Sequence, residues 1–111
     1  MKKSMKTQFL LLVAVLAVGC SAPKELPNGG IWPDDSGVHV NAHGGGILKQ
    51  GDTYYWYGQF MIEGELGNTA QVGVSCYSSK DLLNWKNEGI ALAVSEDPGS
   101  EIAKGSIIER P

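Results

Sequence analysis

The residues of this chain that could do chemistry are few, and the most unusual of them surround a run of glycines. His43 is followed directly by Gly44, Gly45 and Gly46. Three consecutive glycines lower strand propensity, so such a run is typical of a place where two backbones, or a backbone and a ligand, approach closely. The spacing fits neither a dinucleotide-binding loop nor a P-loop. His43 could therefore contact a ligand, or equally be a hydrogen-bonded residue near the crowded axis of a barrel or propeller.

Among the acidic residues, Glu109 stands apart because it follows the apolar pair Ile107–Ile108 and precedes Arg110. This pattern predicts that Glu109 lies at the start of a strand, where it could either pair with Arg110 or bind a ligand. Hydrolysis of a glycosidic bond needs two carboxyl groups, one acid and one base or nucleophile. The remaining candidates fall in predicted loops or exposed edges: Glu63, Glu65, Glu88, Glu96, Asp97 and Glu101. The chain therefore offers one candidate carboxylate rather than a catalytic pair.

Four aromatic residues in succession, 54–57, could belong to a sugar-binding site, since aromatic faces pack on the C–H faces of pyranose rings. Successive side chains of a strand point to opposite faces, so at most two of the four could face one site. Core packing is the favoured interpretation of this run. Gln59 follows the predicted strand and could exchange hydrogen bonds with hydroxyl groups.

Other kinds of catalytic site have little support in the sequence. There is no Gly-x-Ser-x-Gly motif, and neither histidine has an evident partner for nucleophilic catalysis. His39 and His43 are four residues apart, but the sequence between them suits an extended chain or a turn rather than a metal-binding helix. We therefore expect no metal and no cofactor.

The N-terminus has the features of an export signal. Three lysines precede an unbroken apolar run of ten residues, 9–18. A run of this length is typical of a secretory signal and is too short to cross a bilayer, which needs roughly 20 residues. The sequence therefore predicts an exported protein.

A cysteine follows this apolar run at the position expected for lipid attachment. Residues 16–20, Leu-Ala-Val-Gly-Cys, resemble the lipobox of bacterial lipoproteins, although Ala17 stands where a large aliphatic residue is usual. The alternative is an ordinary secretory signal with a chance cysteine. We expect a lipoprotein signal peptide at 1–19 and a lipidated Cys20 that anchors the protein to the cell envelope, in the periplasm or at the cell surface. Cys76 is then left without an intrachain partner and is expected to be a small buried apolar residue.

The net charge of the chain indicates which classes of partner to expect. Removal of residues 1–19 takes away three of the nine basic residues and none of the 12 acidic ones, so the formal charge changes from −3 to −6. A surface of this sign repels phosphate backbones, which excludes nucleic acid as an expected partner. Contact with a membrane would come from the lipid on Cys20 rather than from a basic face.

The mature chain reads as a sequence of short strands. Residues 20–30 are rich in proline and glycine and are expected to form a flexible tether. Four strands with hairpin-like connections are then predicted between about 42 and 94, at a first glycine-rich segment ending near Leu48, at 53–57, at 71–78 and at 88–93. A unit of about fifty residues matches one blade of a β-propeller, whose repeats run roughly 40–50 residues.

A single sheet of this kind cannot cover both of its own faces, and propellers solve this by packing typically about 4–8 blades around an axis. A new apolar segment, 105–108, begins where a second blade would start. We expect an all-β chain in which 31–111 is the N-terminal, incomplete part of a propeller domain. The alternative is a complete small β-sandwich or barrel, which the length permits.

Four segments of the chain together resemble glycoside hydrolase family 43, most closely its exo-β-1,3-galactanase branch. They are 41–48 (NAHGGGIL), 54–58 (YYWYG), 74–85 (VSCYSSKDLLNW) and 107–111 (IIERP). The resemblance implies a five-bladed β-propeller that cleaves glycosidic bonds with inversion, with the first blade and the start of the second represented here.

The resemblance also implies roles for individual residues. Glu109 matches the Glu of a Glu-Arg-Pro motif in the active site near the scissile sugar, so it is the expected catalytic-site carboxylate. His43, Gln59 and Glu109 are the expected substrate-binding residues, and Gln59 stands where the branch is expected to carry Glu. No Asp occupies the place of the usual base on the first strand near 41–44, and the general acid would come from a later blade.

The sequence thus predicts the N-terminal part of an exported, lipid-anchored glycoside hydrolase that cleaves β-galactosidic linkages in galactan-type polysaccharides. The expected partners are a polysaccharide or oligosaccharide and, through Cys20, the membrane. These 111 residues alone are predicted to be inactive. The alternative is a non-catalytic surface lipoprotein that binds glycan or protein through a complete small β-domain.

Overall fold

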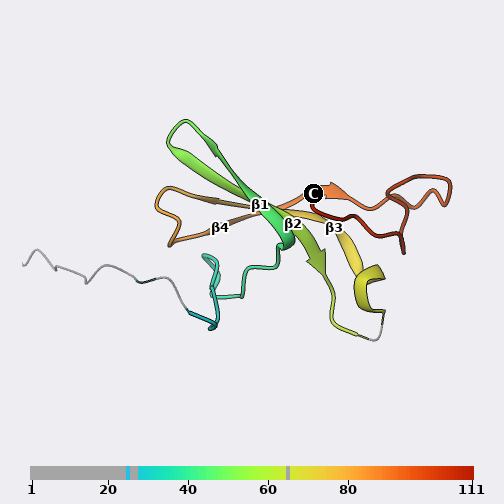
Figure 1. Cartoon of the computed structure of the whole chain (residues 1–111), viewed down its shortest axis with the longest axis horizontal. Coiled ribbons are helices and arrows are strands. Elements are labelled where there is room, and N and C mark those ends of the chain that lie inside the picture. The colour runs from blue at the N-terminus through green and yellow to red at the C-terminus, as the bar shows by residue number, and fades with distance from the viewer. Residues whose placement is uncertain (1–24, 26–27, 65) are drawn as a thin grey trace, which may run out of the picture.

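The computed structural model describes residues 25, 28–64 and 66–111. Within these residues the fold is a single antiparallel sheet in which each strand is hydrogen-bonded to the next one in sequence (Figure 1). Its strands are β1 (His43–Gln50), β2 (Thr53–Met61), β3 (Gln71–Ser79) and β4 (Lys86–Ala93), and a short 3-10 helix, η1 (Gly67–Thr69), precedes β3. The predicted all-β fold with four antiparallel strands is confirmed.

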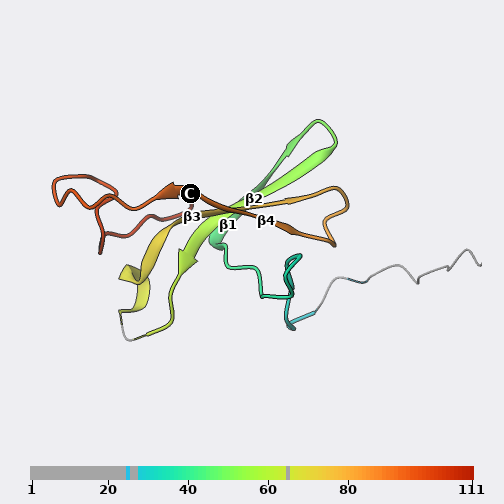
Figure 2. The same cartoon turned by 180° about the vertical axis from the view of Figure 1, so that it is seen from behind.

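The two ends of the sheet carry different kinds of connection. The β1–β2 and β3–β4 turns lie at one end, and the loop with η1 and the C-terminal segment lie at the other, as the front and back views agree (Figures 1 and 2). Because the strands are antiparallel, the start of β1 and the end of β2 meet at this second end, where His43 pairs with Gln59. The residues singled out in the sequence are therefore brought to one end of the sheet.

One face of the sheet carries the core. Trp56 of β2 makes edge-on contacts with Trp32 and Trp85, each with ring centroids 5.2 Å apart. Such edge-to-face geometry adds to the stabilisation that comes from burying the rings. The fully enclosed part of the core consists of Val40, Ala42, Tyr77 and Trp85. Segments that precede β1 and follow β3 therefore cover this face.

The opposite face leaves two leucines exposed. Directly paired residues of antiparallel strands share a face, and Leu48 pairs with Tyr55 while Val74 pairs with Leu92. Leu48 and Leu92 are 57% and 46% exposed. Tyr55 and Tyr57 stack on one another with ring centroids 6.4 Å apart. Core packing thus accounts for Trp56 but not for these two tyrosines.

The turn between β3 and β4 is organised by one carboxylate. Asp81 accepts hydrogen bonds from the backbone N–H groups of Leu83 and Asn84 and from the Asn84 side chain. These donors, the Asn84 backbone N–H first among them, hold the pKa of Asp81 well below its usual range. Ser79 Oγ accepts a hydrogen bond from the N–H of Leu82, whose φ is +63°. The turn thereby directs Trp85 into the core.

Two details of the predicted strands are wrong. β2 does not end near residue 57 but continues to Met61, so Gln59 lies within the strand rather than after it. Residues 105–111 form no strand, and Glu109 is therefore not at the start of one. The backbone enters the left-handed region at Gly105 and at Arg110, with φ of +86° and +49°, which interrupts an extended conformation.

Several predictions fall on residues that the structure does not describe. The signal peptide at 1–19, the lipidation site Cys20 and most of the tether at 20–30 lie outside the described residues. Within the described residues, no helix is long and apolar enough to cross a membrane. Cys76 is a free, buried cysteine, as predicted, and burial raises the pKa of its thiol.

Candidate functional site

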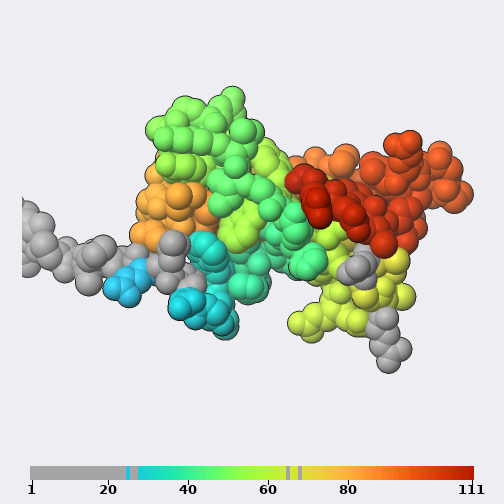
Figure 3. Space-filling model, viewed as in Figure 1, coloured from blue at the N-terminus to red at the C-terminus, as the bar shows by residue number. Residues whose placement is uncertain are grey.

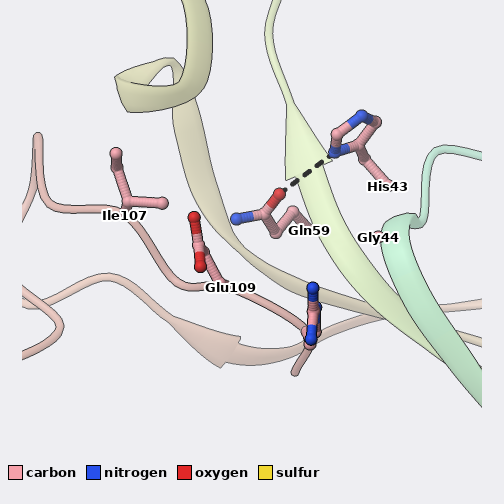
Figure 4. A pocket seen from close by; sticks show the side chains of 6 residues that line it. His43, Gly44, Gln59, Ile107 and Glu109 are labelled. Carbon is pink, nitrogen blue, oxygen red and sulfur yellow. Dashed lines mark hydrogen bonds between the residues drawn. The ribbon is translucent and has the colours of Figure 1, made fainter.

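A pocket of about 190 Å³ lies at the end of the sheet where β1 begins. Two strands and the C-terminal segment contribute to it (Figure 4). Its lining residues are His43, Gly44, Gln59, Ile107, Glu109 and Arg110. The structure therefore brings together all three residues that were predicted to bind a substrate, although they are up to 66 positions apart in the sequence.

The glycine run allows the start of β1 to lie very close to β2. A Cβ atom added to Gly45 would lie 1.8 Å from the carbonyl oxygen of Tyr57, and one added to Gly58 would lie 2.3 Å from the carbonyl carbon of Ala42. The pairing register also shifts between His43 and Gly46, which indicates a bulge. The close approach of two backbones, rather than of a ligand, therefore explains Gly45, and the bulge sets the position of His43.

Asn41, just before β1, also fixes the start of this strand through hydrogen bonds. Its side chain donates to the carbonyl of Met61 over 2.7 Å and accepts from the N–H of Met61 over 2.9 Å. Its backbone N–H donates to the Tyr77 hydroxyl, and its carbonyl accepts from the Ser75 hydroxyl. Sequence reasoning did not single out Asn41, and its only signal was its place beside the glycine run.

Gln59 forms the floor of the pocket. The residue is only 6% exposed, and its Oε1 lies 3.2 Å from Nδ1 of His43. Its Nε2 donates to the carbonyl oxygen of Ile108. Figure 4 shows the contact with His43. Both ends of the amide are therefore occupied within the protein, and the side chain joins β1 to the C-terminal segment.

Glu109 and Arg110 are exposed residues at the pocket. Glu109 makes no ion pair or hydrogen bond with another described residue, so the possible pair with Arg110 is not formed there. A carboxylate left free in a pocket can accept hydrogen bonds from hydroxyl groups of a ligand. Glu109 is also the only carboxylate that lines this pocket among the described residues.

The other sequence candidates are not at this site. None of the four aromatic residues 54–57 lines the pocket. His39 lies outside it and accepts a hydrogen bond from the backbone N–H of Trp32 through Nδ1, over 2.9 Å. This contact gives His39 a structural role in the segment before β1. The space-filling view shows the C-terminal segment lying against β1 and β2, the strands with which it forms the pocket (Figure 3).

No protein-family model and no curated protein matches the chain. Solved structures do. A GH43 β-1,3-galactosidase, in a structure with galactodeoxynojirimycin, is 50% identical over 77% of this chain and 24% of its own, with a TM-score of 0.67. An exo-β-1,3-galactanase from Clostridium thermocellum is 45% identical over 66% of this chain and 15% of its own, with a TM-score of 0.56.

A third solved structure gives the same result. An exo-β-1,3-galactanase from Phanerochaete chrysosporium, in a structure with β-1,3-galactotriose, is 36% identical over 75% of this chain and 18% of its own, with a TM-score of 0.61. The chain thus spans about a quarter or less of the length of these relatives. Over roughly three quarters of its residues, it is a relative of the β-1,3-galactosidases and exo-β-1,3-galactanases of glycoside hydrolase family 43.

Proposed function

We propose that this chain contributes one wall of the galactose-binding pocket of a glycoside hydrolase that cleaves β-1,3-linked galactan. The observation that carries the proposal is the pocket formed by His43, Gln59 and Glu109. It lies in a sheet whose relatives include enzymes solved with galactodeoxynojirimycin and with β-1,3-galactotriose.

Glu109 is the proposed substrate-binding carboxylate at the reacting sugar. Its carboxylate has no partner among the described residues and lines the pocket from the C-terminal segment. A hydrogen bond between a charged group and a ligand hydroxyl is typically worth about 1.5–3 kcal/mol. Glu109 can therefore orient a galactose ring, and its negative charge can favour the positive charge that develops on the ring during cleavage.

The reacting acid and base are proposed to come from outside this sheet. An inverting glycosidase holds two carboxyl groups about 6.5–9.5 Å apart, so that one protonates the leaving oxygen while the other activates a water. Within the described residues the pocket offers Glu109 alone. We propose that the sheet is the first blade of a five-bladed propeller, that later blades supply the acid and the base, and that the 111 residues alone do not hydrolyse galactan.

Residues 1–20 support a proposal about location. A basic start, an apolar run and a lipobox-like sequence together favour export and attachment of lipid to Cys20. Such an anchor would hold the protein at the cell envelope, where polysaccharides outside the cytoplasm are within reach. Replacement of Cys20 by serine should release the protein from membranes in a cell fractionation, whereas retention of the variant would contradict the anchor.

The proposal that this chain binds the sugar while later blades supply the acid and the base is tested by incubating the chain with β-1,3-galactotriose. Release of galactose is followed by chromatography, and contact with the sugar is followed by saturation-transfer NMR. We expect saturation transfer to β-1,3-galactotriose, little transfer to a β-1,4-linked glucose trisaccharide, and no release of galactose. Hydrolysis by the chain alone would contradict the need for further blades, and equal transfer to both sugars would contradict the galactan assignment.

A further inference from the structure

The amide of Gln59 can be oriented in only one way by its neighbours. One end of the amide meets the carbonyl oxygen of Ile108, and the other meets Nδ1 of His43. A backbone carbonyl can only accept a hydrogen bond, so the amide nitrogen must face Ile108. The amide oxygen then faces His43, and this oxygen can only accept.

This orientation decides where His43 carries its proton when the ring is neutral. The contact of 3.2 Å between Gln59 Oε1 and His43 Nδ1 is a hydrogen bond only if Nδ1 bears the hydrogen. The second ring nitrogen, Nε2, is then bare. It has no partner among the described residues, and the His43 side chain is exposed at the pocket.

His39 is held in the opposite state. The backbone N–H of Trp32 can only donate, and it points to Nδ1 of His39 over 2.9 Å. Nδ1 of His39 must therefore be bare, and its proton lies on Nε2. The sequence contains only these two histidines, so each serves as the reference for the other.

We infer that Gln59 is a positioning residue that fixes the Nδ1–H tautomer of His43, so that His43 presents a bare Nε2 as a hydrogen-bond acceptor to a sugar hydroxyl. The second half of this inference rests on the proposed function, whereas the tautomer follows from the protein alone. A neutral acceptor suits a neutral sugar, because a hydroxyl donates to it without the desolvation cost that a charged group carries.

The tautomers are measured directly on the full chain. A two-bond ¹H–¹⁵N correlation spectrum distinguishes protonated from bare ring nitrogens, at pH about 8.5, well above the ~6.5 at which an ordinary histidine titrates. We expect Nδ1 of His43 and Nε2 of His39 in the protonated range and the other two nitrogens in the bare range. His43 protonated on Nε2 would overturn the inference, as would a chain without the dispersed amide signals of a folded sheet.

Two variants separate the role of Gln59 from a general effect on folding. Gln59→Leu removes both hydrogen bonds, and we expect the proton of His43 to move to Nε2 while His39 is unchanged. Gln59→Glu keeps the acceptor for Nδ1 but loses the donor to Ile108, so we expect it to retain the Nδ1–H tautomer. If His43 keeps this tautomer in Gln59→Leu, Gln59 does not position it and the inference fails.

Addition of β-1,3-galactobiose tests the part that rests on the proposed function. A hydroxyl that donates to Nε2 of His43 should shift that nitrogen signal toward the protonated range, with no change at His39. Assigned tautomers without this shift would overturn the sugar-binding role and leave the tautomer assignment standing. Failure of the proposed function is thereby distinguishable from failure of the positioning role.

Discussion

Three side chains from distant parts of the sequence meet in the pocket, and each has a different hydrogen-bonding capacity. Gln59 is buried, with both ends of its amide occupied inside the protein. His43 is exposed, and one of its ring nitrogens has no hydrogen-bond partner among the residues that the structure describes. Glu109 is exposed, and its carboxylate makes no hydrogen bond or ion pair within the described part of the chain. In the proposed function, Glu109 therefore binds the sugar directly, while Gln59 acts through His43 and the backbone.

Replacement of Glu109 by glutamine should weaken binding of β-1,3-galactotriose by about tenfold or more, since a hydrogen bond to a charged group is typically worth about 1.5–3 kcal/mol. The thermal unfolding midpoint should not change, because the carboxylate makes no hydrogen bond or ion pair with the residues that the structure describes. An NMR titration measures the affinity. Glu101→Gln, an exposed carboxylate outside the pocket, is the matched control. Equal affinity in both variants would contradict a role for Glu109.

The sequence pointed to unusual residues at this site, but it did not predict the hydrogen bonds that they make. The His-Gly-Gly-Gly run and the isolated Glu109 stood out in the sequence because their composition is unusual for a strand or a solvated loop, and the structure places them at one pocket. The double hydrogen bond of Asn41 with Met61, 20 positions away, has no local signature. The same holds for the contact of Gln59 with the Ile108 carbonyl, 49 positions away. Such contacts depend on strand register, which the sequence alone leaves open.

At the scale of the elements, the close approach of β1 and β2 creates the site. Gly45 has the Tyr57 carbonyl where a Cβ would be, whereas Gly46 has no heavy atom within 4 Å of that position. Gly45→Ala must therefore push the two strands apart, and overpacking of this kind typically costs about 1–3 kcal/mol of stability. Gly46→Ala should leave stability nearly unchanged.

Chemical denaturation of the two alanine variants measures this difference. We expect a lower denaturation midpoint for Gly45→Ala and loss of the contact between His43 and Gln59, seen in NMR spectra. Equal stabilities of the two variants would show that the backbones do not approach as closely as the structure has them.

The Asp81 turn gives a pH dependence of stability with a defined sign. Hydrogen bonds from Asn84 hold the pKa of Asp81 well below its ordinary value of 3.8. A carboxyl group with a lowered pKa stabilises the fold above its ordinary pKa, and this contribution is lost as the pH falls through the folded-state value. Wild-type protein should therefore lose stability between about pH 5 and pH 2.

Asp81→Asn removes this titrating group, so the variant should be less stable than wild type at neutral pH and should lose less stability on acidification. Denaturant unfolding at several pH values measures both effects. Glu63→Gln, an exposed carboxyl group in the loop before β3, is the control and should retain the wild-type acid dependence. The same slope in Asp81→Asn and wild type would contradict the role assigned to the turn.

The positions of β2 and β3 were predictable because β2 is rich in aromatic residues and β3 alternates between apolar and polar residues. The extension of β2 to Met61 was not predictable, because Gly58 and Gln59 weaken the local strand signal and the strand continues there through pairing with β1 and β3. The apolar pair Ile107–Ile108 predicted a strand within residues 105–111. The left-handed backbone at Gly105 and Arg110 prevents one, and such a backbone at an arginine is rarely visible in sequence.

For the molecule as a whole, the face opposite the tryptophan-rich core exposes apolar side chains, which suits packing against further sheet. One face holds the tryptophan-rich core, and the other exposes Leu92 and also Leu48, which pairs with Tyr55. Exposed apolar side chains on a sheet face favour association. In the proposed propeller a neighbouring blade would cover them.

The isolated chain should accordingly self-associate through this face. Leu48→Lys should lower the association constant by about tenfold, since fully burying a leucine contributes about 1.5–3 kcal/mol. Sedimentation velocity over a range of concentrations measures this. Ile31→Lys, at a residue that is 71% exposed and outside the sheet, should have no effect. A wild-type chain that stays monomeric throughout would contradict this expectation.

The central claim is that His43, Gln59 and Glu109 form one wall of a galactose pocket. It is tested most directly by mapping, residue by residue, the amide chemical-shift changes that β-1,3-galactotriose causes. Because one wall makes only part of the contacts, we expect weak binding, with a dissociation constant on the order of 1 mM, equivalent to about 4 kcal/mol. The changes should group at His43, Gly44, Gln59 and residues 107–110. Changes confined to Leu48, Tyr55 and Tyr57, or none at saturating sugar, would contradict the account.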